Sequence, residues 1–319
     1  MTATTPTSFV DHDLQRVREA LERIGEGDNP LLVETIRHLF GTRGKYIRPT
    51  LALLAGRVFQ PVGELDPRLI DFGAAMEVVH TASLVHDDTL DDAGTRRGAT
   101  TVNAGWNGHI AILLGDYLFA QSAFLIASIG ELRLMAMLAD TIKSLVRGEL
   151  LQMETAFDWD QAEDVYLAKI GNKTASLLAL CTEGAGALYG ADAAQLEALK
   201  TYGYKLGLAF QVVDDILDLT EDDETLGKPA GSDLAQGTIT LPVIYYLRLA
   251  TPKQRALVLD GQHVEECVAS IAASPAIEQA RSYAESLVDD ALTQLSVLPD
   301  GEFRGALRDI AYFSVHRDR

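Results

Sequence analysis

The feature that most constrains this chain is its helical periodicity. Apolar residues recur three and four positions apart along most of the sequence, and no stretch alternates apolar and polar residues as a half-buried strand would. The fold class is therefore expected to be all-α. The pattern predicts helices over residues 10–24, 31–40, 48–59, 67–91, 108–128, 131–156, 161–185, 190–221, 239–249, 263–297 and 302–315.

Two of these segments, 110–129 and 174–188, are apolar on nearly all sides, which is typical of interior helices. The 319 residues are 47% hydrophobic, enough to bury a sizeable core. No Pro/Gly/Ser-rich stretch divides the chain, so a single domain over residues 1–319 is predicted.

The charge balance narrows the classes of partner. With 46 acidic and 27 basic residues, the formal net charge is -19, which argues against nucleic-acid binding because that needs a basic surface. The two cysteines, Cys181 and Cys267, are few enough for a reducing compartment. No secretory signal precedes the first helix, and the apolar stretch 110–129 contains Asp116, so no transmembrane segment is predicted and a cytoplasmic protein is expected.

Two aspartate clusters stand out against this helical background. Both Asp87-Asp88-Asp91 and Asp214-Asp215-Asp218 follow the pattern D-D-x-x-D after an apolar run. The first and last carboxylates share a helix face and repel each other, unless a cation lies between them. Magnesium suits such sparse oxygen ligands, because it keeps several waters and binds substrate phosphate. The clusters are predicted to face each other and hold magnesium against a diphosphate; the alternative is a solvated acidic face.

Basic residues beside glycine lie near both clusters. Gly44-Lys45 and Arg48 precede the first cluster, Arg96-Arg97 follow it, and Gly227-Lys228 follow the second. Lysine and arginine bind phosphate directly, and glycine lets the backbone approach a ligand closely. The separate sets of cations predict two diphosphates, one gripped through metal and one through direct cations.

These residues together resemble the trans-polyprenyl diphosphate synthase family, of the medium- or long-chain octaprenyl or solanesyl type. The matching segments are GKYIRP at 44–49, HTASLVHDDTLDDAGTRRG at 80–98, GDYLFAQ at 115–121, KT at 173–174, FQVVDDILD at 210–218 and LGKPAGSDLAQGTITLP at 226–242. The resemblance covers most of the chain. It implies an isoprenoid synthase-type bundle of roughly ten or more helices around a deep central cavity, usually as a homodimer.

The implied reaction joins isopentenyl diphosphate head to tail to an allylic diphosphate such as farnesyl diphosphate, with three Mg²⁺ ions. By resemblance, two ions bind Asp87 and Asp91, with Asp88 in support, and the third binds Asp214 near Asp215 and Asp218. The allylic diphosphate would contact Arg96, Lys173 and Lys228, and isopentenyl diphosphate would contact Gly44, Lys45, Arg48, His80 and Arg97, with a weaker contribution from the C-terminal Arg317 and Arg319. Thr174 and Gln211 would present oxygens to the developing allylic cation.

One departure concerns Thr238, which stands where short-chain relatives often carry a third lysine. Longer-chain relatives often have a neutral residue there. Asp92 stands where many relatives carry glutamate. The alternative for His80 is a core histidine bonded to backbone, although the substrate-binding role is favoured. These departures leave the predicted activity in place.

Product length is predicted from the residues one helical turn before Asp87. Ala82 and Ser83 are small, whereas bulky aromatics at these positions in the family stop growth early. The growing chain would pass Ala82 and Ser83, then Val79 and Met76, toward a floor on the 108–128 helix, with Leu118, Phe119 and Phe124 as candidates. We expect a C30–C50 all-trans product of the kind used for quinone side chains, with transient membrane contact at release. The alternative is that these small residues only allow tight helix packing.

Other classes of protein remain open from the sequence. A shorter-chain, C15–C25 farnesyl or geranylgeranyl-type synthase would share all the motifs. A class I terpene cyclase would usually lack the GKYIRP cations and the second aspartate cluster. A non-catalytic subunit of a heteromeric synthase typically loses both clusters, and an acidic structural protein would release no pyrophosphate.

Overall fold

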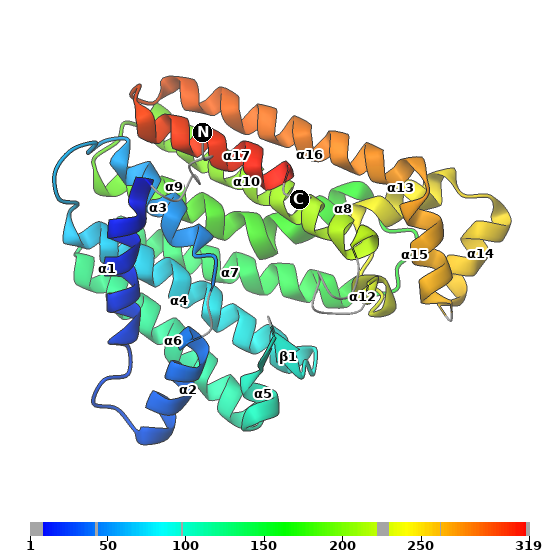
Figure 1. Ribbon diagram of the computed structural model, residues 1–319, viewed down its shortest axis with the longest axis horizontal. Helices are drawn as coiled ribbons and strands as arrows, with labels where there is room; N and C mark the ends of the chain where they lie inside the picture. The colour runs from blue at the N-terminus through cyan, green and yellow to red at the C-terminus, as the bar shows by residue number, and fades with distance from the viewer. Residues whose placement is uncertain (1–8, 42–43, 97, 222–229, 262, 317–319) are drawn as a thin grey trace, which may run out of the picture. The chain divides into compact units, whose positions relative to one another are not determined.

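The computed structural model describes residues 9–41, 44–96, 98–221, 230–261 and 263–316. It is built almost entirely of helices (Figure 1). The helices are α1 Asp11–Glu22, α2 Pro30–Gly41, α3 Ile47–Arg57, α4 Pro67–Leu90, α5 Val102–Gly105, α6 Gly108–Ile129, α7 Leu132–Glu154, α8 Glu163–Ile170, α9 Ser176–Leu188, α10 Ala193–Thr220, α12 Ser232–Ala235, α13 Leu241–Leu249, α14 Pro252–Asp260, α15 Val264–Ala272, α16 Pro275–Gln294 and α17 Glu302–Val315. A π-helical turn, η2 Gly171–Ala175, joins α8 to α9, a 3₁₀ turn, η3, spans Leu295–Val297, and strands β1 Thr95–Arg96 and β2 Ala99–Thr100 form one hairpin. The all-α prediction is confirmed.

The structure differs from the predicted elements in two kinds of place. The helix predicted over 263–297 is divided into α15 and α16, because Pro275 opens a new helix. The hairpin and the short helices α5, α12 and α14 were not predicted, since segments this short show no clear periodicity.

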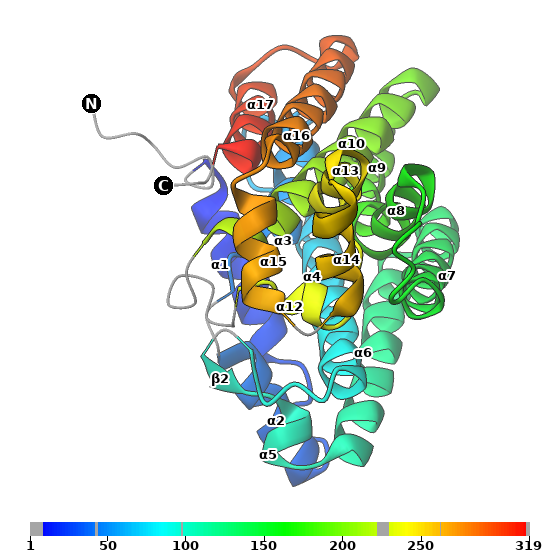
Figure 2. The ribbon, with the colours of Figure 1, turned by 90° about the vertical axis from the view of Figure 1, so that its right-hand side faces the viewer.

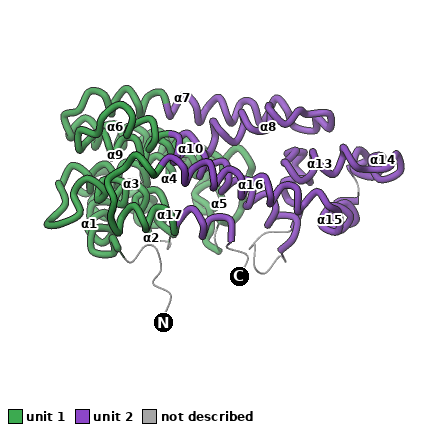
Figure 3. The backbone as a smooth tube through the Cα atoms, turned by 90° about the horizontal axis from the view of Figure 1, so that it is seen from above, with its two compact units in different colours: residues 1–140, 177–200, 295–309 green, residues 141–176, 201–294, 310–319 purple. Residues whose placement is uncertain are grey.

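The chain divides into two compact units (Figure 3). Unit 1 comprises residues 1–140, 177–200 and 295–309, and unit 2 comprises residues 141–176, 201–294 and 310–319. The single domain expected from composition stays a prediction.

Helix α4 is the central element of unit 1. It begins at Pro67 after Asp66, whose carboxylate accepts a hydrogen bond from the Arg68 backbone N–H at 2.9 Å and so caps the helix. It packs most extensively along α6 and also against α3 and α1 (Figure 2). Helix α3 is buried from Pro49 to Gly56. The first aspartate cluster therefore lies at the end of a rigid, well-packed helix.

In unit 2, α13 packs along α16, and α15 contacts both of them. Tyr166 of α8 and Tyr246 of α13 are among the largest fully buried side chains. The Tyr246 hydroxyl lies 2.6 Å from the Ser270 hydroxyl, which gives this buried polar group a partner. The second aspartate cluster lies on α10, within this unit.

Helix α6 differs from the interior helix expected over 110–129. Only 33% of its most apolar window is buried, and Leu113 and Phe124 are 67% and 64% exposed. Among the described residues, α6 is the one helix long and apolar enough to cross a membrane by length and composition, which alone is weak support for a span. The other segment expected to be interior is confirmed: α9 is buried at most positions between Leu177 and Gly186. Apolar composition on all sides therefore predicted burial correctly for α9 and incorrectly for α6.

Candidate active site

The first aspartate cluster lies where α4 ends. Asp91 caps the helix through its backbone N–H, which donates to the Asp87 carbonyl at 2.9 Å. The last turn contains no basic residue. A helix C-terminus already carries partial negative charge, so carboxylates there are electrostatically unfavourable without a cation. Asp87 is half-buried and Asp91 is exposed, whereas Asp88 is buried.

Asp88 has a protein partner of its own. Arg96 Nε donates to Asp88 Oδ1 at 2.5 Å. Burial raises the pKa of Asp88, and the charge and hydrogen bond of Arg96 oppose that rise. Asp88 thus positions Arg96, and its expected supporting role at the magnesium ions stays a prediction.

Arg96 lies on the β1–β2 hairpin, which α2 and the following loop hold in place. His38 of α2 places Nε2 2.7 Å from the Thr100 carbonyl, and its ring packs edge-on against Trp106. Thr101 Oγ1 donates to the Ala93 carbonyl at 2.6 Å. These contacts fix the hairpin relative to the end of α4.

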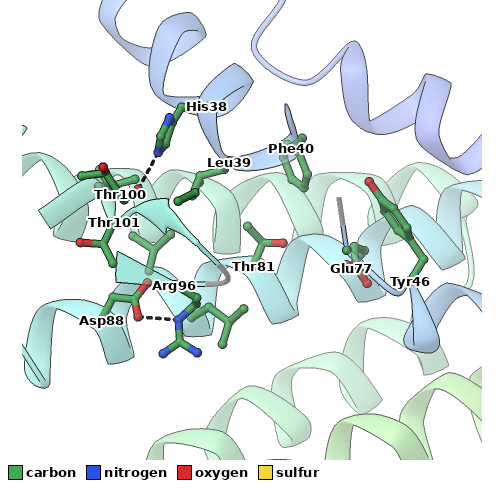
Figure 4. Close-up of a pocket in the computed structure, with 15 residues that line it drawn as sticks. His38, Leu39, Phe40, Tyr46, Glu77, Thr81, Asp88, Arg96, Thr100 and Thr101 are labelled. Carbon is green, nitrogen blue, oxygen red and sulfur yellow. Dashed lines mark hydrogen bonds and ion pairs between the residues drawn. The ribbon is translucent and has the colours of Figure 1, made fainter. Parts of the chain in front are cut away.

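A pocket of about 70 Å³ lies beside the Asp88–Arg96 pair (Figure 4). It is lined by residues of two predicted motif segments, Gly44 of 44–49 and Thr81 and Arg96 of 80–98, together with His38 of α2. A volume of this size holds a few waters at most. Gly44 and Tyr46 of the GKYIRP segment thus line the same pocket as Asp88 of the first aspartate cluster.

The GKYIRP segment enters α3 through an unusual backbone conformation. Tyr46 has φ of 48°, in the left-handed region, which is rare for a bulky residue and typical of functional sites. Its carbonyl accepts hydrogen bonds from the Thr50 N–H and hydroxyl, and Arg18 packs over its ring. This turn leaves Lys45 exposed and Arg48 half-buried in the first turn of α3. His80 is half-buried on α4.

The predicted chain-length residues lie on α4 in the same unit. Val79 and Ala82 are fully buried, and Ser83 is half-buried with its hydroxyl donating to the His80 carbonyl at 2.8 Å. Of the floor candidates on α6, Leu118 is fully buried, whereas Phe119 packs near the His86 ring. Phe124 is mostly exposed, so it lines no interior of this chain and its proposed role was wrong.

The second cluster is arranged differently from the first. Asp215 is buried, and its two oxygens accept hydrogen bonds from the Tyr166 hydroxyl at 2.7 Å and from Gln211 Nε2 at 2.9 Å. Burial, and then the charge of Asp233, raise the pKa of Asp215 to about 8, and the two hydrogen bonds oppose the rise. Asp215 is therefore held by Tyr166 and Gln211 within the cluster.

Asp218 is also buried and held by the loop that follows α10. Ser232 Oγ donates to Asp218 Oδ1 at 3.1 Å, and the Asp233 N–H lies 3.4 Å from Oδ2. The Gly231 N–H donates to the Asp218 carbonyl at 2.8 Å. Asp214 is half-buried, so it is the most accessible carboxylate of the three.

Lys173 and Thr174 lie on the π-helical turn η2, a feature frequent at functional sites. Glycines allow the neighbouring helices to approach this turn: a Cβ at Gly148 of α7 would lie 2.6 Å from Lys173 N, and one at Gly207 of α10 would lie 2.5 Å from Ala175 Cα. Lys173 pairs with Glu149 and lies 3.3 Å from Gln152 Oε1. The turn thus holds a lysine between two helices of unit 2.

Thr174 and Gln211, predicted to act together, are in direct contact. Thr174 Oγ1 donates to Gln211 Oε1 at 2.9 Å. Because the amide of Gln211 donates to Asp215, one chain of hydrogen bonds runs from Thr174 to the second cluster. This chain orients the Gln211 amide.

Lys169 is a residue that the sequence analysis missed. It is 3% exposed, and its Nζ donates to the Ile239 carbonyl at 3.1 Å, which also accepts from Gln161 Nε2 at 3.1 Å. Burial lowers the pKa of Lys169, whereas Asp215 and Asp233 act to raise it. The sequence did contain one indication of its role: Lys169 lies four residues before Lys173, and residues four apart share a helix face.

Some predicted contacts stay predictions. Arg97, Lys228, Arg317 and Arg319 lie outside the described residues. The first cluster belongs to unit 1 and the second to unit 2, so their facing arrangement also stays a prediction. Within the part of the chain that is described, no three His, Cys, Asp or Glu side chains form a ready-made metal site. Magnesium needs no such cage, because it binds through one or two carboxylates together with substrate phosphates.

Comparisons with known proteins identify the chain's relatives. The sequence model of the polyprenyl synthetase family matches residues 29–274. A heptaprenyl diphosphate synthase component 2 from Geobacillus stearothermophilus is 40% identical over 98% of this chain and 98% of that protein. A chloroplastic solanesyl-diphosphate synthase 2 from Oryza sativa subsp. japonica is 37% identical over 97% of this chain and 78% of that protein.

A solved structure of a Caulobacter crescentus CB15 polyprenyl synthase, complexed with calcium and isoprenyl diphosphate, matches with a TM-score of 0.92 and 30% identity, over 98% of this chain and 97% of that one. The fold is therefore that of the isoprenoid synthases. The chain belongs to the polyprenyl synthetase family and is a prenyltransferase. Its relatives confirm the predicted resemblance to medium- and long-chain synthases.

Proposed function

We propose that this chain is a magnesium-dependent polyprenyl diphosphate synthase that condenses isopentenyl diphosphate head to tail with an allylic diphosphate such as farnesyl diphosphate. The product is an all-trans C30–C50 diphosphate for quinone side chains. The observation that carries this proposal is the hydrogen-bonded chain from Thr174 through Gln211 to Asp215, beside Asp214 and on the same turn as Lys173.

Three magnesium ions would bind the allylic diphosphate, two through Asp87 and Asp91 and one through Asp214. These are the most accessible carboxylates of their clusters, whereas Asp88 and Asp215 are occupied by Arg96 and by Tyr166 with Gln211. When bound, the ions neutralise the diphosphate and make it a better leaving group. The protein contributes carboxylates that α4 and α10 position.

The cations of the chain would divide between the two substrates. Arg96, Lys173 and Lys228 would bind the allylic diphosphate, and Gly44, Lys45, Arg48, His80 and Arg97 would bind isopentenyl diphosphate. Lys173 is already oriented by Glu149, and Arg96 by Asp88. Preorganised donors of this kind lower the cost of binding charge in the transition state.

Thr174 and Gln211 would stabilise the allylic cation as the diphosphate leaves. Their oxygens lie in one hydrogen-bonded chain, so they need little reorganisation. The isopentenyl double bond then forms the new carbon–carbon bond. The departing pyrophosphate accepts the proton lost from the adjacent carbon, so no side-chain base is required.

Reversed-phase analysis of products from farnesyl diphosphate, isopentenyl diphosphate and Mg²⁺ tests this proposal. We expect a ladder ending between C30 and C50. A product ending at C20–C25 would instead support the shorter-chain alternative, and a cyclised hydrocarbon would support a terpene cyclase. Absence of magnesium-dependent pyrophosphate release would contradict any synthase.

The exposed apolar face of α6 supports a homodimer. Ile112, Leu113 and Phe124 are all about half or more exposed on one helix, and contiguous apolar surface of this kind marks an interaction site. We expect light scattering to give twice the chain mass of 34.6 kDa. Leu113→Glu should give a monomer and the exposed loop variant Val62→Glu a dimer; a dimeric Leu113→Glu would place the interface elsewhere. We also propose that the protein is cytoplasmic and contacts a membrane transiently when it releases its product.

A further inference from the structure

One face of α4 leads away from the first aspartate cluster. Phe72, Met76, Val79, Ser83 and Asp87 are spaced three or four residues apart, so their side chains lie in one stripe along the helix. All five residues belong to unit 1. If the growing chain passes Ser83, it must continue along this stripe.

The side chains of the stripe beyond Ser83 are fully buried. Val79, Met76 and Phe72 are all 0% exposed. An elongating chain must therefore displace these side chains in turn. Val79 is small, and methionine is unbranched and adapts easily to new surroundings. Neither residue forms a firm barrier.

Phe72 is different because backbone lies behind its ring. A Cβ built at Gly184 of α9 would lie 2.4 Å from Phe72 Cζ and 2.8 Å from Cε2. The ring tip is therefore packed directly against the α9 main chain, at a glycine that leaves room for it. An aromatic ring held between two helices cannot move aside without shifting one of them.

We propose that Phe72, wedged against Gly184, is the residue that sets the maximum length of the product. This inference rests on the proposed synthase function and on the chain growing along α4. It replaces the floor expected on α6 with a floor between α4 and α9. Met76 and Val79 then yield to the chain, and Phe72 stops it.

The position of Phe72 also narrows the range of product lengths that we expect. A bulky residue at position 82 or 83 is expected to stop growth at C15–C20. Phe72 lies ten or eleven residues further along α4, which is about 16 Å of helix. An extended isoprene unit of four carbon–carbon bonds spans about 5 Å, so about three more units fit. Growth should therefore end at C30–C35, the short end of the proposed range.

Product analysis of Phe72→Leu and Phe72→Ala tests the inference. Each variant removes part of the Phe72 ring and opens space as far as the next turn of α4, about 5.4 Å away. We therefore expect the product to lengthen by about one isoprene unit in Phe72→Leu and by one or two in Phe72→Ala. Phe303→Leu is the matched control, because Phe303 is a buried phenylalanine of the same unit that packs on Phe9 and Arg57 instead. The control should keep the wild-type product.

The two proposals fail in different ways. A wild-type product ending at C30–C35, with a lengthened ladder in both Phe72 variants, supports the inference. Unchanged length in Phe72→Leu, the variant expected to fold most reliably, overturns it while the synthase function stands. A wild-type product beyond C35 also overturns it, because the chain would then have passed Phe72. A wild-type protein that makes no prenyl product overturns the proposed function itself.

Discussion

The two aspartate clusters share one sequence pattern but differ in their surroundings. The first lies at the C-terminal end of α4, where Asp91 is exposed and Arg96 binds the middle carboxylate. The second lies within α10, where the start of α12 holds Asp218 and two uncharged side chains hold Asp215. The same pattern thus lies at a partly exposed helix end in unit 1, whereas in unit 2 it lies within a helix and two of its carboxylates accept hydrogen bonds from neighbouring residues.

This difference indicates how each cluster is used. At the first, the carboxylates lie at a helix C-terminus, which carries a partial negative charge of its own. A bound cation would therefore relieve the repulsion between the carboxylates and the helix dipole. At the second, Asp215 and Asp218 are buried and held by the partners named above, whereas Asp214 is half-buried and is the ligand that we propose. The first cluster should therefore bind metal as a pair of carboxylates, and the second as a single positioned one.

Removing divalent metal should give the largest effect, because it disables both clusters. With excess EDTA, we expect pyrophosphate release to fall to background and to return when Mg²⁺ is added in excess. Circular dichroism should show unchanged helix content. Turnover that persists in EDTA would exclude both clusters from the reaction.

Asp214→Asn and Asp215→Asn should separate the two roles within the second cluster. We expect Asp214→Asn to lower kcat by about 10²–10³-fold, as for loss of a group that stabilises transition-state charge. Asp215→Asn keeps the shape and one acceptor oxygen, so a loss of about 10-fold is expected, typical of a supporting residue. Equal losses of kcat in the two variants, measured in steady-state assays, would contradict the different roles assigned to Asp214 and Asp215.

Lys169 tests whether the second cluster depends on buried support. Lys169→Met should raise KM for the allylic diphosphate, with a loss of about 10–100-fold in kcat/KM, because the Ile239 carbonyl and the nearby Asp215 and Asp233 lose a positive partner. Lys169→Arg should recover part of the activity, since it keeps the charge. An Arg variant no better than Met would show that packing alone matters.

His38 provides the corresponding test at the first cluster. His38→Ala removes the contact with the Thr100 carbonyl and should raise KM for isopentenyl diphosphate by a few-fold, equivalent to about 1 kcal/mol for one lost hydrogen bond. We expect kcat to change little. His12, exposed on α1, offers a control, and His12→Ala should behave as wild type.

The smallest effect on rate is expected from Ala82→Phe, although its effect on product should be clear. The new ring lies one turn from Asp87, so the product should shorten toward C15–C20 while turnover continues. Ser83→Phe should act similarly. The second cluster already has Phe210 four residues before Asp214, so Phe210→Leu is the control, and we expect it to leave product length unchanged. Unchanged length in Ala82→Phe would contradict growth along α4.

Sequence reasoning located the long helices well because apolar spacing defines them. The predicted bounds of α4 and α6 differ from the structure by one residue. It missed the π turn, because one extra residue per turn leaves little trace in apolar spacing. It also missed the partners of Asp215, since Tyr166 lies 49 residues away in sequence. Side-chain chemistry proposes which residues form the site, whereas only packing shows which protein partners Asp88, Asp215 and Asp218 have.

The π turn at 171–175 has a consequence for how this chain tolerates insertions and deletions. In a regular α-helix each extra residue rotates everything beyond it by about 100°, whereas a π turn accommodates one extra residue within a single turn. Deleting one residue from this turn would restore a regular helix and leave Leu177 and Cys181 on the buried face of α9, but it would change the direction of Lys173 and Thr174. The positions of Lys173 and Thr174 therefore depend on this one extra residue, whereas the core register of α9 does not.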